Sequence, residues 1–368
     1  MRKKILFLLS ILVVASMLLV ACQPTEEPAA EEEVVEEEVA EEEVVEEEEA
    51  EVEETEEEEA EVEEPIKIGL SIMELTAYTW FLGAVDGCNQ YVADHPEANF
   101  EFQVEDSQSD VQTMLNNIEN LVTAGSKGII LFPADPTSAI PLMKQYVADG
   151  IPFVIGDYAQ QPTSDDDIVW STFVGHDMKA LGIVAGQVGV EYLKTLGKDD
   201  PVVLFISRPE SGQVSQDRVD GFSETILAEF PNATIIVEGD IGSGTVESAQ
   251  NLTENVLQRE PVIDLISGHN DAKVIGAYLA AVAANRTEIK FIGIAGHVDV
   301  MNYIADGNEA WLGEVLQDPV VLGYQAADAM YKVLILGEEI PLEYELPLPE
   351  AITPDNIDEY DWENWSWL

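Results

Sequence analysis

Short apolar runs alternate with longer amphipathic stretches from Ile66 onward, and each strand-plus-helix repeat spans roughly 30 residues, the length of a βαβ unit. Val- and Ile-rich runs that recur between helical periods are typical of parallel strands with both faces covered. We expect strands at 66–72, 100–106, 128–132, 152–157, 201–207, 233–240, 262–268 and 289–296, with GEVLQDP (313–319) following a last short strand. Helices are expected at 80–95, 111–125 and 137–150, and after each later strand. The two series predict an α/β protein with two doubly wound parallel sheets.

The chain starts with a segment typical of a secretory leader. Three cations at positions 2–4 precede an almost wholly apolar run, residues 5–21, which is slightly short for a membrane span of about 20 residues. The motif LVAC at 19–22 resembles the bacterial lipobox, which implies cleavage before Cys22 and lipidation of its sulfur. The alternative is a plain membrane anchor with an incidental cysteine. We therefore expect a signal peptide at 1–21 and a lipid on Cys22 that holds the protein at a membrane.

The next segment is dominated by glutamate. Residues 26–64 contain 25 Glu and no Lys or Arg, so they cannot bury enough apolar surface to fold, and their charges repel one another. We expect residues 22–64 to be the lipidated cysteine and a disordered acidic tether. Without these glutamates and the three leader cations, residues 65–368 still carry a net charge of about −35. Nucleic acid is therefore a poor partner, because its binding relies on Lys and Arg at the phosphates.

Ligands of open α/β sheets bind beyond the carboxyl ends of the strands, and those ends are polar or aromatic in both series. The first series ends in Glu74, Tyr78, Trp80, Phe81, Asp106, Asp157 and Tyr158. The second series ends in Arg208, GSG at 242–244, GHND at 268–271 and AGH at 295–297. A cleft between two such edges would be lined by aromatic faces, amides and carboxylates.

Several longer motifs occur in a set order between residues 66 and 347. They are IKIGLSI with YTWFLGAVDG, VEDSQSDVQTMLNNIENLVTAGSKGIILFPAD, GIPFVIGDY, QDRVDGF, SGHNDAKVIGAY and LQDPVVLGYQAADAMYKVLILGEEIP. In this order they resemble the type 1 periplasmic binding proteins of the ribose/galactose class, the receptors of sugar ABC importers. The resemblance implies two Rossmann-like lobes, joined by three crossings, that close on one sugar. It also implies an ABC permease as partner and a place in the cell envelope, in the periplasm or on the outer face of the cytoplasmic membrane.

The same resemblance divides the chain. It implies an N-terminal lobe at 66–173 and 318–345, and a C-terminal lobe at 174–317 and 346–368 that ends in an acidic, Trp-rich tail. The hinge is then expected near Val174, Gln317 and Leu346. The tail extends past the last strand usual in the family, and the sequence leaves open whether its tryptophans cover the hinge or lie on a lobe. We expect a monomer.

The ligand contacts of the family fall on six residues of this sequence: Trp80, Phe81, Asp157, Arg218, Asn270 and Gln317. Their chemistry suits a sugar, because an apolar C–H face can lie on an aromatic ring while charged and amide groups bond to adjacent hydroxyls. Five of the six residues, all except Gln317, also have a structural alternative. These alternatives are helix-start core for the two aromatic residues, a turn cap for Asp157, a surface ion pair for Arg218 and an N-cap for Asn270.

Two positions depart from the family pattern. Tyr158 stands where an Arg is frequent, and Ala295 stands where an Asp is usual. His297 and Tyr78 are nearby substitutes. One charged residue that would hydrogen-bond to the ligand's hydroxyls is therefore missing. The sequence leaves undecided whether the ligand is a deoxy sugar, a pentitol, an inositol or a nucleoside.

Other classes of protein fit the sequence less well. The four histidines are spread along the chain, and neither a nucleophile elbow, a P-loop, a zinc-binding motif nor paired cysteines are present, so we expect no enzyme, no cofactor and no metal. A repressor of this fold would need a basic DNA-binding segment where this chain has glutamates. A sensor that presents its ligand to a signalling partner remains open. Cys88, in a helical pattern, is expected to be a small buried hydrophobe.

Overall fold

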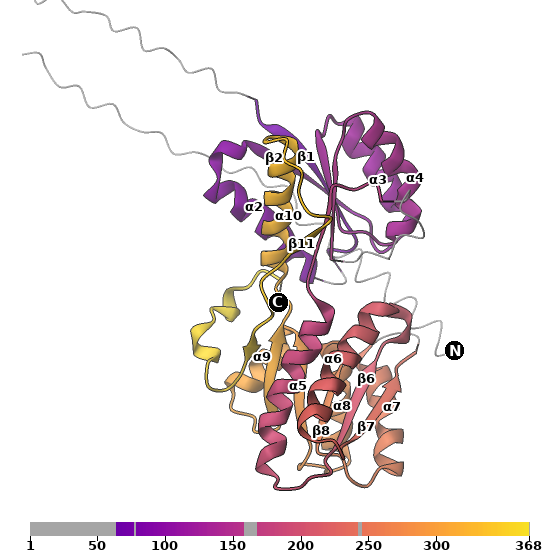
Figure 1. Cartoon of the computed structure of the whole chain (residues 1–368), viewed down its shortest axis with the longest axis vertical. Helices are drawn as coiled ribbons and strands as arrows, with labels where there is room; N and C mark the ends of the chain where they lie inside the picture. Colours follow the sequence, from indigo (N-terminus) through magenta and orange to yellow (C-terminus); the bar gives the residue numbers. More distant parts are fainter. Residues whose placement is uncertain (1–63, 77–78, 158–167, 242–244, 368) are drawn as a thin grey trace, which may run out of the picture. The chain divides into compact units, whose positions relative to one another are not determined.

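The computed structural model of the full chain describes residues 64–76, 79–157, 168–241 and 245–367 (Figure 1). These residues form two six-stranded sheets, in the orders β11-β5-β4-β3-β1-β2 and β12-β10-β9-β8-β6-β7. All strand pairs are parallel except β10 with β12. The predicted α/β class with two doubly wound sheets is confirmed. Within the same four ranges, no helix is long and apolar enough to cross a membrane.

The first sheet is covered by helices on both faces. Its strands are β1 (Ile66–Ile72), β2 (Phe100–Asp106), β3 (Gly128–Leu131), β4 (Phe153–Gly156), β5 (Thr172–Gly175) and β11 (Glu343–Glu345). Its helices are α2 (Trp80–Asp94), α3 (Val111–Thr123), α4 (Pro136–Ala148) and α10 (Pro319–Leu334), with the short η1 (Pro96–Ala98). Ile129 and Leu131 belong to the core under α3 and α4, whereas Ile130 and Phe132 belong to the core that contains residues of α2 and α10. This two-sided burial explains why the inner strands β3 and β4 contain only apolar residues and glycine.

The second sheet repeats this design. Its strands are β6 (Val202–Ser207), β7 (Thr234–Gly239), β8 (Leu265–Gly268), β9 (Lys290–Ala295), β10 (Trp311–Leu316) and β12 (Ala351–Ile352). Its helices are α5 (Met178–Thr195), α6 (Gln213–Glu229), α7 (Val246–Arg259), α8 (Asp271–Ala283) and α9 (Val298–Ala305), with the short η3 (Pro209–Ser211), η4 (Ile357–Glu359) and η5 (Trp362–Asn364). Val203 and Phe205 join the core under α5 and α6, and Leu204 and Ile206 join the opposite core.

Glycines allow one helix pair in each half to pack at backbone contact. A Cβ added to Gly323 of α10 would lie 1.9 Å from the carbonyl oxygen of Ala84 in α2. A Cβ on Gly182 of α5 would lie 2.2 Å from the carbonyl oxygen of Arg218 in α6. Cys88 is buried in the first of these contacts, as expected, and its thiol donates to the carbonyl of Gly323. Candidate site residues lie on α2 and on α6. These contacts hold each of the two helices in position against its neighbour.

The chain passes between the two sheets three times, which agrees with the predicted three-crossing connection. The first passage follows Gly175, the last residue of β5, two residues beyond the expected boundary. The second follows Leu316 of β10 and leads into α10, and the third follows Glu345 of β11 and leads to β12. Gln317 therefore lies at the second passage.

Most element boundaries fall within a few residues of those predicted, with two informative differences. The strand expected from 262 begins at Leu265; just before it, the side chain of Asp264 accepts a bond of 2.7 Å from the Val202 amide and pairs with Lys198. Residues 313–316, expected to follow a last short strand, belong to β10 itself. Asp177 caps α5 through a bond from the Ala180 amide, so the HD pair at 176–177 lies at the start of this helix.

Candidate functional site

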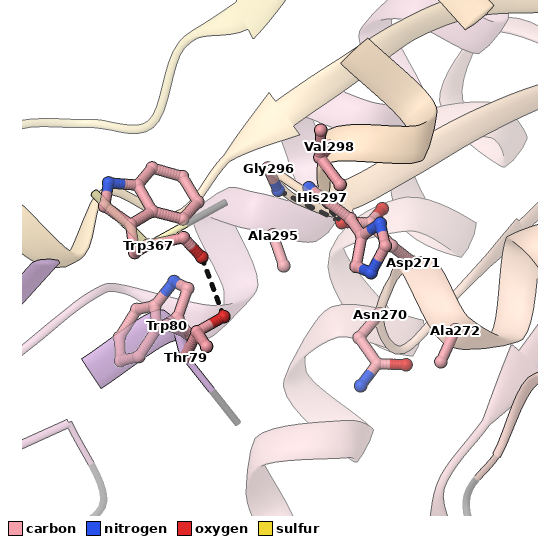
Figure 2. A pocket seen from close by; sticks show the side chains of 10 residues that line it. All are labelled: Thr79, Trp80, Asn270, Asp271, Ala272, Ala295, Gly296, His297, Val298 and Trp367. Carbon is pink, nitrogen blue, oxygen red and sulfur yellow. Dashed lines mark hydrogen bonds between the residues drawn. The ribbon is translucent and has the colours of Figure 1, made fainter. Parts of the chain in front are cut away.

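A cavity of about 250 Å³ lies at the carboxyl ends of strands from both sheets (Figure 2). Its lining comes from the start of α2, from the loops after β8 and β9, and from the C-terminal segment. The lining residues are Thr79, Trp80, Asn270, Asp271, Ala272, Ala295, Gly296, His297, Val298 and Trp367. The position agrees with the edge that the parallel topology predicts for a ligand.

Trp80 and Phe81 are neighbours in α2 but have different surroundings. Trp80 lines the cavity, and its indole Nε1 donates to the carbonyl oxygen of Gln317 at 3.0 Å. Phe81 lies behind it in the core, edge-on to Trp80 with ring centroids 5.0 Å apart, and contacts Phe132. Successive helical residues point about 100° apart, so one of the pair faces the cavity and the other faces the sheet.

Arg218 is buried on α6, with an exposed fraction of 4%. Its guanidinium donates to the backbone carbonyl of His269 and, at 2.8 Å, to Oε1 of Gln317. The Nε2 of Gln317 donates in turn to Oδ1 of Asp157 at 3.2 Å. Three residues predicted from sequence thus form one polar chain, which joins the end of β4 in the first sheet to α6 in the second.

Asp157 has an unusual backbone conformation and a carboxyl with a raised pKa. Its φ of 62° lies in the left-handed region, and its amide donates to the carbonyl of Val174 at 2.9 Å. Burial raises the pKa of its carboxyl to about 6, although the charge of Arg218 acts in the opposite direction. Asp157 lines a second cavity together with Gly175, His176, Met178 and Leu346, and is not among the residues that line the first.

Asn270 occupies the N-cap position of α8, as the structural alternative anticipated, but its side chain does not cap the helix. Its amide points into the cavity (Figure 2). Within the described part of the chain, its buried Oδ1 has no hydrogen-bond partner. A buried acceptor without a partner lowers stability by about 1–3 kcal/mol. A ligand hydroxyl that entered the cavity and donated to this oxygen would remove that cost.

His297 stands at the mouth of the cavity as the N-cap of α9. Its Nδ1 accepts from the Asp299 amide at 3.1 Å, and its side chain is half exposed. Tyr78, Tyr158 and Cys22, which the sequence also singled out, lie outside the described residues.

A buried pair of carboxyls, Asp271 and Glu314, supports the loop between β9 and α9. Asp271 accepts from the amides of Ile294 and His297, each at 2.9 Å, and Glu314 accepts from the amide of Gly296 at 2.6 Å. Burial raises the pKa of both carboxyls, and the neighbouring Asp271 raises that of Glu314 further. The pair holds the backbone that forms one wall of the cavity.

Residues 68–339 match the family model described as "Periplasmic binding protein domain", which covers most of the chain. The chain belongs to this family. The resemblance seen in its motifs is confirmed, and members of the family are binding proteins. The parallel sheets, the three passages and the cavity at the strand ends are therefore features of a periplasmic binding protein.

Two curated relatives are similar in sequence to this periplasmic binding protein over most of its length. It is 24% identical over 295 residues to a xylitol-binding protein of Mycolicibacterium smegmatis, covering 79% of this chain and 78% of that protein. It is 22% identical over 269 residues to the ribose import binding protein of Escherichia coli, covering 73% of this chain and 85% of that protein.

Solved structures agree with the fold. An ABC transporter solute-binding protein of Mycobacterium smegmatis with bound glycerol has a TM-score of 0.66 and 25% identity, covering 80% of this chain and 96% of that one. A second, from Actinobacillus succinogenes with bound D-allose, has a TM-score of 0.69 and 20% identity over 80% of this chain and 100% of the other, and shows the fold alone.

Two residues of the site, Glu314 and Trp367, were not singled out as site residues in the sequence. Asp271 was named only as part of the GHND motif at a strand end, without a role of its own. Glu314 is one acid inside an apolar strand, and that isolated charge was the available signal. Trp367 lies in a tail without periodicity, and its sequence gives no indication of where it packs.

Proposed function

We propose that this periplasmic binding protein captures a small neutral sugar or polyol and delivers it to an ABC importer. The observation that supports this most is the cavity at the strand ends, where the indole of Trp80 faces the amide of Asn270 across a space of about 250 Å³. An aromatic face suits the C–H side of a polyol, and amide groups suit its hydroxyls. The two relatives described above are named for xylitol binding and for ribose import, and both compounds are of this class.

We further propose that Asp157, Arg218 and Gln317 act together as a polar clasp for the ligand. Their hydrogen-bonded chain joins the two sheets, so a hydroxyl that bonds to it would contact both halves at once. Trp80 supplies the stacking face, with Phe81 behind it as support. The site has the groups of a binding pocket, and we propose that it binds its ligand without catalysis.

The proposed lobes are residues 66–173 with 318–345, and 174–317 with 346–368. We propose that they close on the ligand at the three passages between the sheets, near Val174, Gln317 and Leu346. Closure of this kind would bring the edge that carries Trp80 toward the edge that carries Asn270. We propose that the protein acts as a monomer.

A thermal-shift screen of the full chain, purified in detergent, tests this function. We expect one or more of xylitol, D-ribose, D-allose and myo-inositol to raise the melting temperature, because a ligand that binds only the folded state stabilises it. D-gluconate, a charged compound of similar size, is the matched control and should give no shift. A shift with gluconate or a nucleoside alone would contradict the proposed ligand class.

The raised pKa of Asp157 predicts a pH dependence of binding. Ionised Asp157 accepts hydroxyl bonds, so affinity should fall by up to about tenfold as the pH decreases from about 7.5 to about 5. Stability without ligand should change in the opposite direction. A carboxyl whose pKa is raised to about 6 on folding stabilises the fold most at low pH, and this contribution is lost as the pH rises through about 6.

Calorimetry of the parent and of Asp157→Asn over this pH range checks the prediction. The variant, which cannot ionise at this position, should bind more weakly with a flat profile. An equally steep profile in both proteins would show that another group titrates.

We propose that a leader at 1–21 is cleaved and that Cys22 carries a lipid that holds the protein at the cell envelope, outside the cytoplasm. The support for this is the LVAC motif at the end of an apolar run, in residues that lie outside the described ones. The glutamates that follow would then act as a spacer between the membrane and the binding domain.

Cys22→Ser tests the anchor. The variant should remain uncleaved or be shed from the membrane, because no thiol is left to carry acyl chains. Cells fed radiolabelled palmitate should label the parent protein and not the variant, with Cys88→Ser as the matched control that keeps its label. Label in the Cys22→Ser protein at the level of the parent would disprove lipidation at this position.

A further inference from the structure

The C-terminal segment after β12 follows two short turns, η4 and η5, and then enters the cavity. Its penultimate residue, Trp367, is 4% exposed and is one of the residues that line the cavity. Trp365 stacks on its outer side, with ring centroids 4.8 Å apart and planes inclined by 14°. Trp367 is therefore packed in place at the proposed ligand site.

Trp367 contacts elements that belong to different sheets. Thr79, at the start of α2, donates its hydroxyl to the carbonyl oxygen of Trp367 at 3.0 Å. A Cβ added to Gly83 of α2 would lie 2.5 Å from Cδ1 of the indole, and one added to Gly296, after β9, would lie 2.8 Å from Cη2. The two ends of the ring thus rest on two glycines, one from each half of the protein.

The two tryptophans of the cavity lie on the same side of it. In Figure 2, Trp367 and Trp80 face the space from one side, and Asn270 and His297 lie on the other. This gives the cavity an apolar wall of two indoles and a polar wall of an amide and an imidazole. A ligand that matches it has one C–H face and hydroxyls on the opposite face.

We propose that Trp367 is a ligand-binding residue, and that the C-terminal segment forms the third wall of the site beside the two lobes. The inference rests on the proposed function and deepens it, because it gives the ligand as a compact polyol with one apolar face, in contact with Trp80 and Trp367 together. The indole of Trp367 packs on both Gly83 and Gly296, which belong to different proposed lobes. A ligand bound to Trp367 would therefore be sensitive to how the two lobes are placed relative to each other.

Fluorine NMR of the full chain labelled with 5-fluorotryptophan tests the contact directly. The chain has six tryptophans, and the resonance of Trp367 is the one that disappears in Trp367→Phe. Saturation with xylitol or myo-inositol should shift the resonances of Trp367 and Trp80. The resonance of Trp311, which is buried in the second sheet against Tyr303, should stay in place.

Calorimetry then measures what the indole contributes. Trp367→Ala should bind the same polyol about tenfold more weakly or worse, and Trp367→Phe, which keeps an aromatic ring in the same seat, should lie between it and the parent. Tyr360→Phe is the matched control. It lies in the same segment and loses a hydroxyl that donates to Glu350 at 2.6 Å, away from the cavity, so its affinity should equal that of the parent.

Two results separate the inference from the function on which it rests. A Trp367 resonance that stays unchanged at saturation, or a Trp367→Ala affinity within about twofold of the parent, would overturn the role of Trp367 while the binding function stands. If the parent binds none of xylitol, D-ribose, D-allose and myo-inositol, the proposed ligand class fails and this inference fails with it.

Discussion

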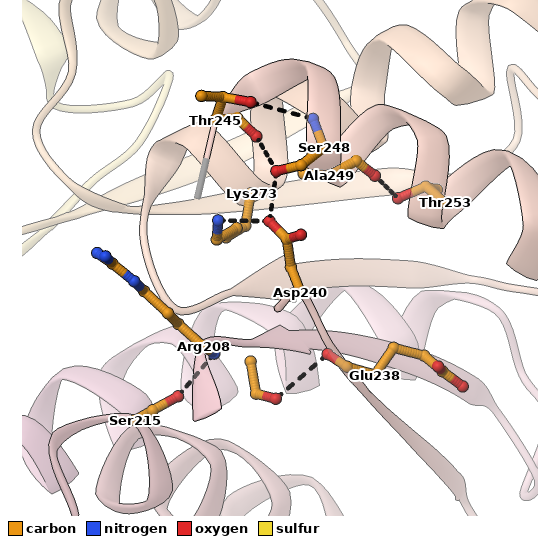
Figure 3. A network of polar contacts seen from close by, with 10 residues as sticks. Arg208, Ser215, Glu238, Asp240, Thr245, Ser248, Ala249, Thr253 and Lys273 are labelled. Atoms are coloured by element: carbon orange, nitrogen blue, oxygen red, sulfur yellow. Dashed lines mark hydrogen bonds and ion pairs between the residues drawn. The ribbon is translucent and has the colours of Figure 1, made fainter. Parts of the chain in front are cut away.

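Replacing Asp240 by alanine is expected to lower the free energy of unfolding by about 3–5 kcal/mol. Asp240 follows β7, and its Oδ2 lies 2.5 Å from Nζ of Lys273, a lysine of α8 with an exposed fraction of 0% (Figure 3). The hydroxyl of Ser248 donates to the same carboxylate oxygen at 2.9 Å. Without the carboxylate, the ammonium of Lys273 would be buried and uncompensated, and that cost dominates the loss.

Urea denaturation of the variant measures the loss, and two further proteins assign its cause. Asp306→Ala, at an exposed position after α9, is the matched control and should stay within about 0.5 kcal/mol of the parent. The double variant Asp240→Ala with Lys273→Met should recover much of the stability, because the buried charge is removed. If the double variant is no more stable than Asp240→Ala alone, the uncompensated charge of Lys273 is not the cause of the lost stability.

Replacing Arg218 by alanine is expected to weaken ligand binding by about tenfold or more. Arg218 contributes a buried positive charge and bonds to Gln317, which in turn bonds to Asp157. Its removal would delete the charge-assisted donor that we propose for the ligand and would leave the polar chain incomplete. Loss of one such partner costs about 1.5–3 kcal/mol, and 1.4 kcal/mol corresponds to a factor of ten in affinity.

Calorimetry with the polyol that stabilises the protein most in the thermal-shift screen measures this effect. Arg259→Ala is a matched control, since Arg259 forms an exposed ion pair with Glu238 on the second sheet. Arg218→Lys keeps the positive charge but lacks the planar guanidinium with its several N–H donors. It should bind the ligand better than the alanine variant and worse than the parent. Parental affinity in Arg218→Ala would mean that this arginine only holds α6 against the loop after β8.

The sequence predicts at which edge of the sheets the cavity lies. It predicts less well which side chains line that cavity. Trp80 and Asn270 were predicted because each follows an apolar strand, and parallel topology brings such strand ends to one edge. Both line the cavity. The prediction needed no knowledge of side-chain packing, since the alternation of strands and helices already fixes that edge.

Packing decided the features that the sequence left open. Phe81 and Trp80 look alike in the sequence, but a helix turns by about 100° per residue, so Phe81 packs in the core against Phe132. Glu314 lies in a strand covered on both faces, where alternation does not tell which side chains are buried. Trp367 has no periodic context, and its position depends on the space above Gly83 and Gly296, which exists once the two halves are folded.

A crystal structure of the protein with its best polyol tests the central claim most directly. The account predicts ligand density in the cavity between Trp80 and Asn270, with hydroxyls in hydrogen-bond distance of Asn270. Once the lobes have closed as proposed, other hydroxyls should reach the chain formed by Arg218, Gln317 and Asp157. A ligand found elsewhere on the molecule, with this cavity filled by ordered water alone, would contradict it.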